Sequence, residues 1–166
     1  MSRNLPALTL ALAFSLAGAP AAAMPPAALD FELSDGQRFV TLSSLPATPT
    51  IVNFWRADCP PCLREMPELA ALARSGKARV ITIALQRPAE TAAAPAAILA
   101  ALQPPLLNLH GPSEPRGLLA RFGNRVGALP YTVILDSERR PCARQAGEIN
   151  RHWLDGRLAA CRQGTS

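Results

Sequence analysis

The clearest change of hydrophobic pattern along this chain lies between residues 51 and 73. Residues 51–55 form an apolar run, which is typical of a β-strand buried on both faces. Cys59 and Cys62 follow, separated by two prolines. From residue 60 to residue 73, apolar side chains recur at the three- and four-residue spacing of one helix face, namely Leu63, Met66, Leu69, Ala70 and Ala73. The pattern predicts a buried strand, a turn that carries two cysteines, and a helix.

Shorter segments of both kinds occupy the rest of the chain. Residues 31–33 and 38–42 alternate apolar and polar side chains around Asp35-Gly36, which predicts a β-hairpin. Further strands are expected over residues 78–85, 131–135 and 142–147, with residues 106–109 as a short edge strand or an extended loop. Helices are expected over residues 90–102, 116–122 and 150–162, although Pro95 disfavours the first turn of the first of them. Strands that alternate with helices predict an α/β fold of three layers, a central sheet with helices on both faces.

The first 23 residues have the composition of a signal peptide. Arg3 supplies the positive charge, residues 5–16 the apolar core, and residues 20–23 the small side chains that a signal peptidase reads. We expect cleavage after Ala23, which leaves one domain over residues 24–166 in the periplasm, without stable membrane insertion. The alternative is an uncleaved anchor, because residues 5–23 carry no charge and nearly reach the length that spans a bilayer. No cysteine precedes Cys59, so lipid attachment at a processed N-terminal cysteine is excluded.

Charge and cysteine content restrict the classes of function. The chain has 17 Lys and Arg against 12 Asp and Glu, a formal net charge of +5, and loss of Arg3 with the signal peptide leaves +4. The basic residues are scattered and form no run interleaved with aromatic side chains, so a nucleic-acid surface is not supported. All four cysteines lie in the part expected to be exported, where an oxidising compartment permits disulfide chemistry.

The sequence Cys59-Pro60-Pro61-Cys62, after a strand and before a helix, is the arrangement of a dithiol redox site. Unpaired backbone N–H groups and the positive end of the helix dipole favour a thiolate at Cys59. We therefore expect Cys59 to attack a disulfide and Cys62, one helical turn further on, to resolve the mixed disulfide. The electrons reside in the dithiol, so no cofactor is implied.

Metal binding and an inert disulfide are the alternatives for this motif. A zinc site would want a second closely spaced Cys or His pair, whereas Cys142 and Cys161 are nineteen positions apart and His110 and His152 are isolated. We therefore expect no metal. An inert disulfide would leave the strand before it and the helix after it unexplained. The alternative from another functional class is a copper(I)-handling module for respiratory oxidase assembly, since two cysteine sulfurs suit Cu(I), but few methionines accompany them.

Three blocks of sequence together resemble the thioredoxin superfamily, and most of all its exported TlpA/ResA-type thiol:disulfide oxidoreductases. They are Val-Asn-Phe-Trp at 52–55 leading to the two cysteines, Glu-Met-Pro-Glu-Leu at 65–69, and Gly-Ala-Leu-Pro-Tyr-Thr-Val-Ile-Leu-Asp at 127–136. With the hairpin and the last helix they cover nearly all of residues 24–166. The resemblance implies a thioredoxin-like fold with a central mixed β-sheet and an N-terminal β-hairpin.

The same resemblance assigns a substrate-binding surface. Pro130 is expected to be a cis-proline that faces the dithiol, with the backbone of its neighbour Leu129 pairing with a strand of the substrate. Without the resemblance, an ordinary edge-strand proline would be preferred at this position. Trp55, Pro60 and Pro61 complete the expected surface.

Glu65, three residues after Cys62, matches a carboxylate on the helix of the family. A carboxylate there would manage the proton of the resolving thiol. The alternative is a charge on the helix surface, paired with Arg64 or Arg74. Asn53 stands where thioredoxin itself has a buried acid, and an amide cannot take a proton, so Asn53 is not a base.

Two charged residues depart from the family pattern. Asp58 stands where an aromatic residue, commonly Trp, precedes the first cysteine, and Arg56 where a small residue is usual. The departure leaves open whether the partner is an apocytochrome in cytochrome c maturation, an oxidase subunit or a misoxidised enzyme. We expect a monomer that acts on disulfide-containing exported proteins and takes electrons from an upstream membrane donor.

The residues around Cys59 predict the direction of electron transfer. Pro60 and Pro61 have no N–H to stabilise a thiolate, and Asp58 disfavours the anion, while Arg56 offsets part of that effect. The pKa of Cys59 is then expected to lie near that of an ordinary thiol. Such a couple is relatively reducing, so we expect the protein to reduce its partners.

Cys142 and Cys161 are predicted to form a structural disulfide. Cys142 opens a predicted strand and Cys161 closes the helix that follows it, so a helix folded back over its own strand brings the two together. A loop of this length would stabilise the fold by about 3 kcal/mol in the chain-entropy model. The alternatives are two buried free cysteines or a second exchange pair.

Overall fold

The computed structural model describes residues 26–163 of the chain, and the predicted signal peptide lies outside them. Within residues 26–163, no helix is both long and apolar enough to cross a bilayer. The strands are β1 (Glu32–Ser34), β2 (Phe39–Thr41), β3 (Thr50–Trp55), β4 (Arg79–Ala84), β5 (Leu107–His110), β6 (Tyr131–Leu135) and β7 (Pro141–Ala146). The helices are α1 (Pro60–Ser75), α2 (Pro88–Ala92), α3 (Ala96–Ala101), α4 (Arg116–Arg121) and α5 (Arg151–Arg162), with a 3-10 turn at Leu42–Ser44.

The seven strands form one sheet in the order β2-β1-β5-β4-β3-β6-β7. Strand β4 runs parallel to both β3 and β5, and the other pairings are antiparallel. The mixed sheet and the N-terminal hairpin of β1 and β2 confirm the predicted fold class. Strand β5 is not at an edge, as one sequence interpretation had it, because the hairpin pairs with its free side through Ser34 and His110.

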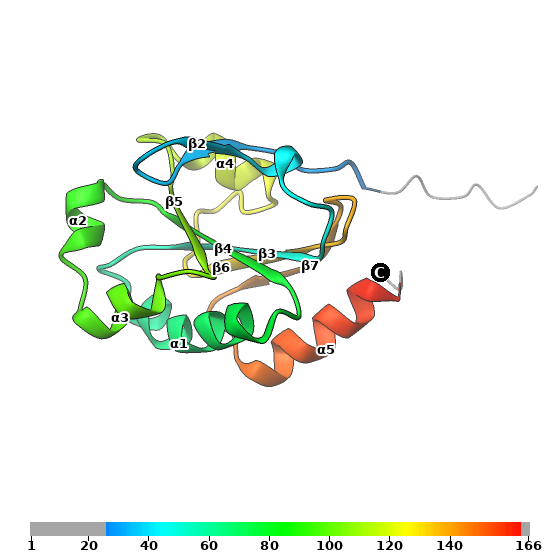
Figure 1. Cartoon of the computed structure of the whole chain (residues 1–166). Coiled ribbons are helices and arrows are strands. Elements are labelled where there is room, and N and C mark those ends of the chain that lie inside the picture. The colour runs from blue at the N-terminus through cyan, green and yellow to red at the C-terminus, as the bar shows by residue number, and fades with distance from the viewer. Residues whose placement is uncertain (1–25, 164–166) are drawn as a thin grey trace, which may run out of the picture.

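Helices cover both faces of the sheet, as predicted (Figure 1). The side chains of β3 alternate between two apolar clusters. Ile51 and Trp55 pack in the cluster that holds the inner faces of α1, α3 and α5. Val52 and Phe54 pack in the other, with α4 and the hairpin. Strand β3 is buried along its whole length, which agrees with its apolar sequence.

The prediction of a single helix over residues 90–102 is wrong. Helix α2 ends at Ala92, and α3 begins after Pro95, whose backbone is extended. Proline has no N–H to donate and its ring clashes with the preceding helical turn, so the chain bends here and two short helices form.

The predicted ends of α1 and α5 are confirmed. Cys59 caps α1, and Pro60 and Pro61 occupy its first turn, where proline is tolerated because no intrahelical N–H is needed. The helix ends at Ser75, and Gly76 caps it with a φ of +67° that suits glycine. Asn150 caps α5 by accepting the N–H of Trp153 at 3.0 Å. A disulfide joins Cys142 on β7 to Cys161 in the last turn of α5.

Candidate functional site

Cys59 and Cys62 are joined by a disulfide at the start of α1. Cys59 is partly exposed, whereas Cys62 is fully buried on the inner face of the helix. The N–H of Cys62 donates to the Cys59 Sγ at 3.3 Å. Because Pro60 and Pro61 have no N–H, this is the donor that the first turn of α1 offers to the sulfur. The geometry presents one sulfur to a partner and keeps the other beneath it.

Arg56 and Asp58 form a two-point ion pair beside Cys59. The Arg56 Nε and Nη2 atoms lie 2.8 and 3.0 Å from the two carboxylate oxygens of Asp58, and Nη1 donates to the carbonyl of Leu85 at 3.0 Å. The hydrogen bonds from Arg56 lower the pKa of Asp58. Arg56 thus offsets most of the negative charge of Asp58. Asp58 therefore destabilises a Cys59 thiolate less than the sequence alone indicates.

Glu65 lies inside the molecule, with 1% of its surface exposed. Its Oε1 accepts a hydrogen bond from the Asn53 side chain at 2.6 Å, and its Oε2 accepts one from the main-chain N–H of Ile149 at 2.9 Å. Burial raises the pKa of Glu65 from 4.5 to about 7, against the opposing effect of these two donors. A surface charge paired with Arg64 or Arg74, the alternative that the sequence allowed, is therefore wrong.

Three polar contacts fasten α1 to residues 148–151, which lead from the turn after β7 into the first residue of α5. The buried bond from Ile149 to Glu65 is the central one. On either side lie ion pairs, an exposed one between Arg64 and Glu148 at 2.7 Å and a partly buried one between Glu68 and Arg151 at 3.0 Å. We name residues 148–151 the strap. It closes over Glu65 from a part of the chain that is distant in sequence.

A row of polar side chains crosses the sheet beneath α1. Thr132 on β6, Asn53 on β3, Thr82 on β4 and Asn108 on β5 are aligned strand by strand. The Asn53 Nδ2 donates to the Thr132 Oγ1 at 3.0 Å, and the Thr82 hydroxyl donates to the Asn108 Oδ1 at 2.9 Å. Asn53, Thr82 and Thr132 are fully buried. Glu65 therefore rests on a polar row within an otherwise apolar cluster.

The residues expected to bind the substrate differ in how far they are buried. The Leu129–Pro130 peptide bond is cis, as the resemblance implied. The carbonyl of Pro130 accepts the N–H of Gly147, whereas the backbone of half-buried Leu129 makes no hydrogen bond with residues 26–163. Pro60 is exposed and Pro61 half-buried. Trp55 is fully buried, so its indole lies beneath the site and not on its surface.

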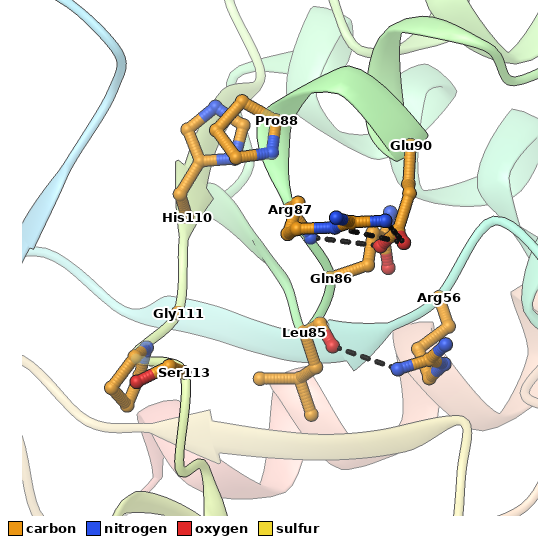
Figure 2. Close-up of a pocket in the computed structure, with 10 residues that line it drawn as sticks. Arg56, Leu85, Gln86, Arg87, Pro88, Glu90, His110, Gly111 and Ser113 are labelled. Atoms are coloured by element: carbon orange, nitrogen blue, oxygen red, sulfur yellow. Dashed lines mark hydrogen bonds and ion pairs between the residues drawn. The ribbon is translucent and has the colours of Figure 1, made fainter.

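A hollow of about 400 Å³ lies next to the loop that carries Arg56. Figure 2 shows Arg87 and Glu90 paired across one side of it, while Arg56 reaches the carbonyl of Leu85. A second hollow, of about 330 Å³, shares Arg56 and Glu90 and extends to Asp58. Neither is lined by a cysteine. Among residues 26–163, no group of three or more His, Cys, Asp and Glu side chains is placed to hold a metal ion.

Sequence reasoning identified the two cysteines and Glu65 but missed the groups that hold the carboxyl. Asn53 was considered only as a residue that takes no proton, although a lone amide within an apolar run is a signal of a buried polar contact. Thr132 was noticed only within a strand. No sequence signal indicates the N–H of Ile149, because that bond depends on how the strap docks.

Comparisons with known proteins agree with this fold. Similar solved structures include a DsbE-type thiol:disulfide interchange protein from Chlorobium tepidum (TM-score 0.66, 19% identity, 82% of this chain and 96% of that one). They also include a secreted disulfide oxidoreductase of Mycobacterium tuberculosis homologous to DsbE of E. coli (TM-score 0.61, 20% identity, 78% and 95%). A thio-disulfide isomerase from Thermus thermophilus is similar too (TM-score 0.64, 23% identity, 85% and 98%). No curated protein matches the sequence.

The model of the AhpC/TSA family matches residues 25–152, which include the dithiol, Glu65 and the cis-proline. This range covers most of the chain. The protein therefore belongs to the AhpC/TSA family, and it is a thiol:disulfide oxidoreductase of the thioredoxin superfamily in which Cys59 and Cys62 form a disulfide.

Proposed function

We propose that this protein is an exported enzyme that reduces disulfides in partner proteins. The observation that carries the proposal is the pairing of a partly exposed Cys59 at the cap of α1 with a buried Cys62, three residues before the buried acid Glu65. This arrangement separates the attacking sulfur from the resolving sulfur. It also places a group able to accept a proton on the side of the resolving thiol.

In the reducing direction, the reaction runs through one mixed disulfide. The Cys59 thiolate attacks a disulfide of the partner, and one partner sulfur leaves as a thiolate. Cys62 then loses its proton and attacks the Cys59 Sγ, which expels the second partner sulfur. The partner gains two electrons and ends as a dithiol, while Cys59 and Cys62 end as a disulfide. A reduced dithiol donor must then restore the enzyme.

Glu65 is the group to which we assign the proton of Cys62. Both residues face the interior from α1 and are three positions apart, so they lie on one side of the helix. A carboxylate whose pKa is about 7 accepts a proton from a thiol more readily than a solvated carboxylate would. Glu65 is buried, so the proton acceptor that the structure offers is the carboxylate itself.

The scarcity of donors around Cys59 supports reduction over oxidation. The N–H of Cys62 is the donor to the Cys59 Sγ, and two prolines remove the others from the first turn. A strongly oxidising dithiol depends on heavy stabilisation of its first thiolate, because that stabilisation favours the reduced form. The paired charges of Arg56 and Asp58 contribute little net field. The couple is then relatively reducing.

Export follows in this proposal from the predicted signal peptide over residues 1–23. The partners are disulfide-containing proteins of the periplasm, and an upstream membrane donor supplies electrons to a monomeric enzyme. The unpaired backbone of Leu129 is where we place the strand of the partner, in the manner of β-strand addition. The hollow beside Arg56 is then available to the polypeptide that flanks the reacting cysteine.

Equilibration against a glutathione redox buffer tests the direction. We expect a potential in the range of reducing dithiol proteins, together with a Cys59 thiol whose ultraviolet titration is close to that of a free cysteine. A strongly acidic Cys59 and a potential near that of known dithiol oxidants would contradict the reducing role. Trapping with Cys62→Ala, which preserves the mixed disulfide, would identify the partner, and Cys59→Ala is the matched control that should trap nothing.

A further inference from the structure

The Asn53 amide has an unusual distribution of hydrogen bonds for a fully buried side chain. Its Nδ2 donates twice, to the Glu65 Oε1 at 2.6 Å and to the Thr132 Oγ1 at 3.0 Å. Its Oδ1 is buried and has no partner among residues 26–163. A buried acceptor without a donor is unfavourable, so the amide as placed satisfies only its nitrogen.

The two neighbours of the Nδ2 atom are both oxygens that can also act as donors. A protonated Glu65 has one O–H, and Thr132 has a hydroxyl whose proton rotates to suit its surroundings. A separation of 2.6 Å is short for N–H···O and lies within the usual range for O–H···O. An Asn53 oxygen in the place of Nδ2 would accept from both.

We propose that Asn53 is a positioning residue whose amide turns over when Glu65 gains or loses its proton. With the carboxylate, Nδ2 faces Glu65 and donates to it. With the acid, Oδ1 faces Glu65 and accepts the carboxyl proton and the hydroxyl proton of Thr132. The turned amide exchanges the unpaired Oδ1 for an Nδ2 in the same place, so the two hydrogen bonds that it gains through Oδ1 are the ones that favour it.

The strap does not compete for this proton. The Glu65 Oε2 accepts the main-chain N–H of Ile149, which can only donate, so the proton of the acid is directed to Oε1 and therefore to Asn53. The polar row supplies uncharged groups from β3, β4 and β6. The amide is thus the part of the site that must change when the proton arrives.

The charged and titratable groups near Glu65 lie on two elements. On α1 they are Cys62, Cys59 and the members of the flanking ion pairs, Arg64 and Glu68. On the strap, Glu148 raises the pKa of Glu65 by its negative charge, and Arg64 partly offsets that charge. In the disulfide form neither cysteine titrates. Measurements on the oxidised protein are therefore free of any cysteine titration.

The effect of the turning amide on catalysis rests on the proposed function, in which Glu65 takes the proton of Cys62. A site that pairs well with both the acid and the carboxylate lowers the cost of moving the proton between Cys62 and Glu65. The turning amide supplies such pairing without movement of the backbone.

Nuclear magnetic resonance on the oxidised wild-type protein tests the proposal without any variant. The Glu65 carboxyl carbon is followed through its titration, together with cross-relaxation from the Asn53 Nδ2 protons. We expect these protons to lie near Thr132 above the midpoint and to lose that contact below it. If their contact with Thr132 persists on both sides of the midpoint, the proposal is overturned.

Two substitutions separate positioning from packing. Asn53→Leu removes the amide at similar size, and we expect mixed-disulfide resolution to slow and its pH profile to change, because the acid and the carboxylate both lose a partner. Thr91→Val, which alters another buried threonine outside the polar row, should leave the profile unchanged. An unshifted profile in folded Asn53→Leu would also count against the positioning role.

The same measurements distinguish this inference from the proposed function. If the amide turns with the titration of Glu65 but the resolution rate ignores that titration, the proton role of Glu65 is wrong and the turning amide stands. If the resolution rate follows Glu65 while Asn53 keeps one orientation, the proton role stands and the inference is wrong.

Discussion

Ile149 donates its main-chain N–H to the carboxylate of Glu65 across 84 positions of sequence, at 2.9 Å. This one bond connects the redox helix α1 to the segment that starts α5. The carboxyl that the proposed mechanism uses is therefore buried by a distant part of the chain. Its proton affinity is a property of the assembled fold and not of the helix alone.

Glu65 gives the stability of the oxidised protein a specific pH dependence. Its pKa rises from 4.5 to about 7 on folding, so the folded state binds more protons between these values. The contribution is fully present below pH 4.5 and is lost as the pH rises through 7, which corresponds to about 3 kcal/mol of unfolding free energy. Urea unfolding at a series of pH values measures it. Glu65→Gln should remove this slope and Glu68→Gln should not; a slope that survives Glu65→Gln would contradict the assignment.

The two cysteines of the reduced protein should differ in reactivity. Cys59 is partly exposed at the helix cap, while Cys62 is fully buried, so a limiting amount of alkylating reagent should label Cys59 first. Peptide mapping by mass spectrometry identifies the modified residue. Faster labelling of Cys62 would reverse the roles of attacking and resolving thiol.

The bond between Cys142 and Cys161 should contribute stability and no chemistry. Replacing both with alanine removes the closure of the loop from β7 to the end of α5, which we expect to cost about 3 kcal/mol of unfolding free energy. Disulfide exchange by Cys59 and Cys62 should continue at temperatures where the variant is folded. Denaturant unfolding and an exchange assay measure the two effects. Loss of exchange in a folded variant would indicate that the second pair takes part in the reaction.

The opposite charges of Arg56 and Asp58 should nearly cancel at the Cys59 sulfur, so that the pair as a whole has little effect on the pKa of that thiol. Arg56→Gln leaves the Asp58 charge beside Cys59 and should raise the pKa of that thiol, a modest effect because the pair is solvated. Asp58→Asn should lower it by a similar amount. Ultraviolet titration of the thiolate measures both, and the double variant serves as the control that should restore the starting value. Identical titrations in all four proteins would show that the pair acts only on partner binding.

The parts of the fold that the sequence predicts best are those that depend on local pattern. The run over residues 51–55, the two cysteines and the spacing of Leu63, Met66 and Leu69 are sufficient for β3 and α1, and Asn150 for the start of α5. The sequence indicates that Pro95 disfavours a helical turn, but it does not indicate that Pro95 divides the segment into two helices. The position of β5 inside the sheet was also missed, because only the hairpin that pairs with it shows that it is not an edge.

In the candidate site, too, the features that depend on local sequence were predicted, and those that depend on contacts between distant segments were not. The dithiol was found from spacing, and the cis bond before Pro130 from the resemblance. The surroundings of Glu65 were not found, because they combine β3, β6 and the strap, which approach one another only in the folded chain. For Asp58, the sequence predicted that Arg56 offsets part of its effect, and the structure shows a two-point ion pair between them.

The strap also sets an order of events during biosynthesis. A chain that has been made only as far as β7 already holds Cys59, Cys62 and Glu65, but it lacks Ile149 and the residues that close over the acid. In such a nascent chain Glu65 is hydrated and behaves as an ordinary carboxyl. The two thiols are therefore present before the strap docks on α1, whereas the buried proton acceptor forms only after it. The two cysteines are thus present before the segment that buries the Glu65 carboxyl.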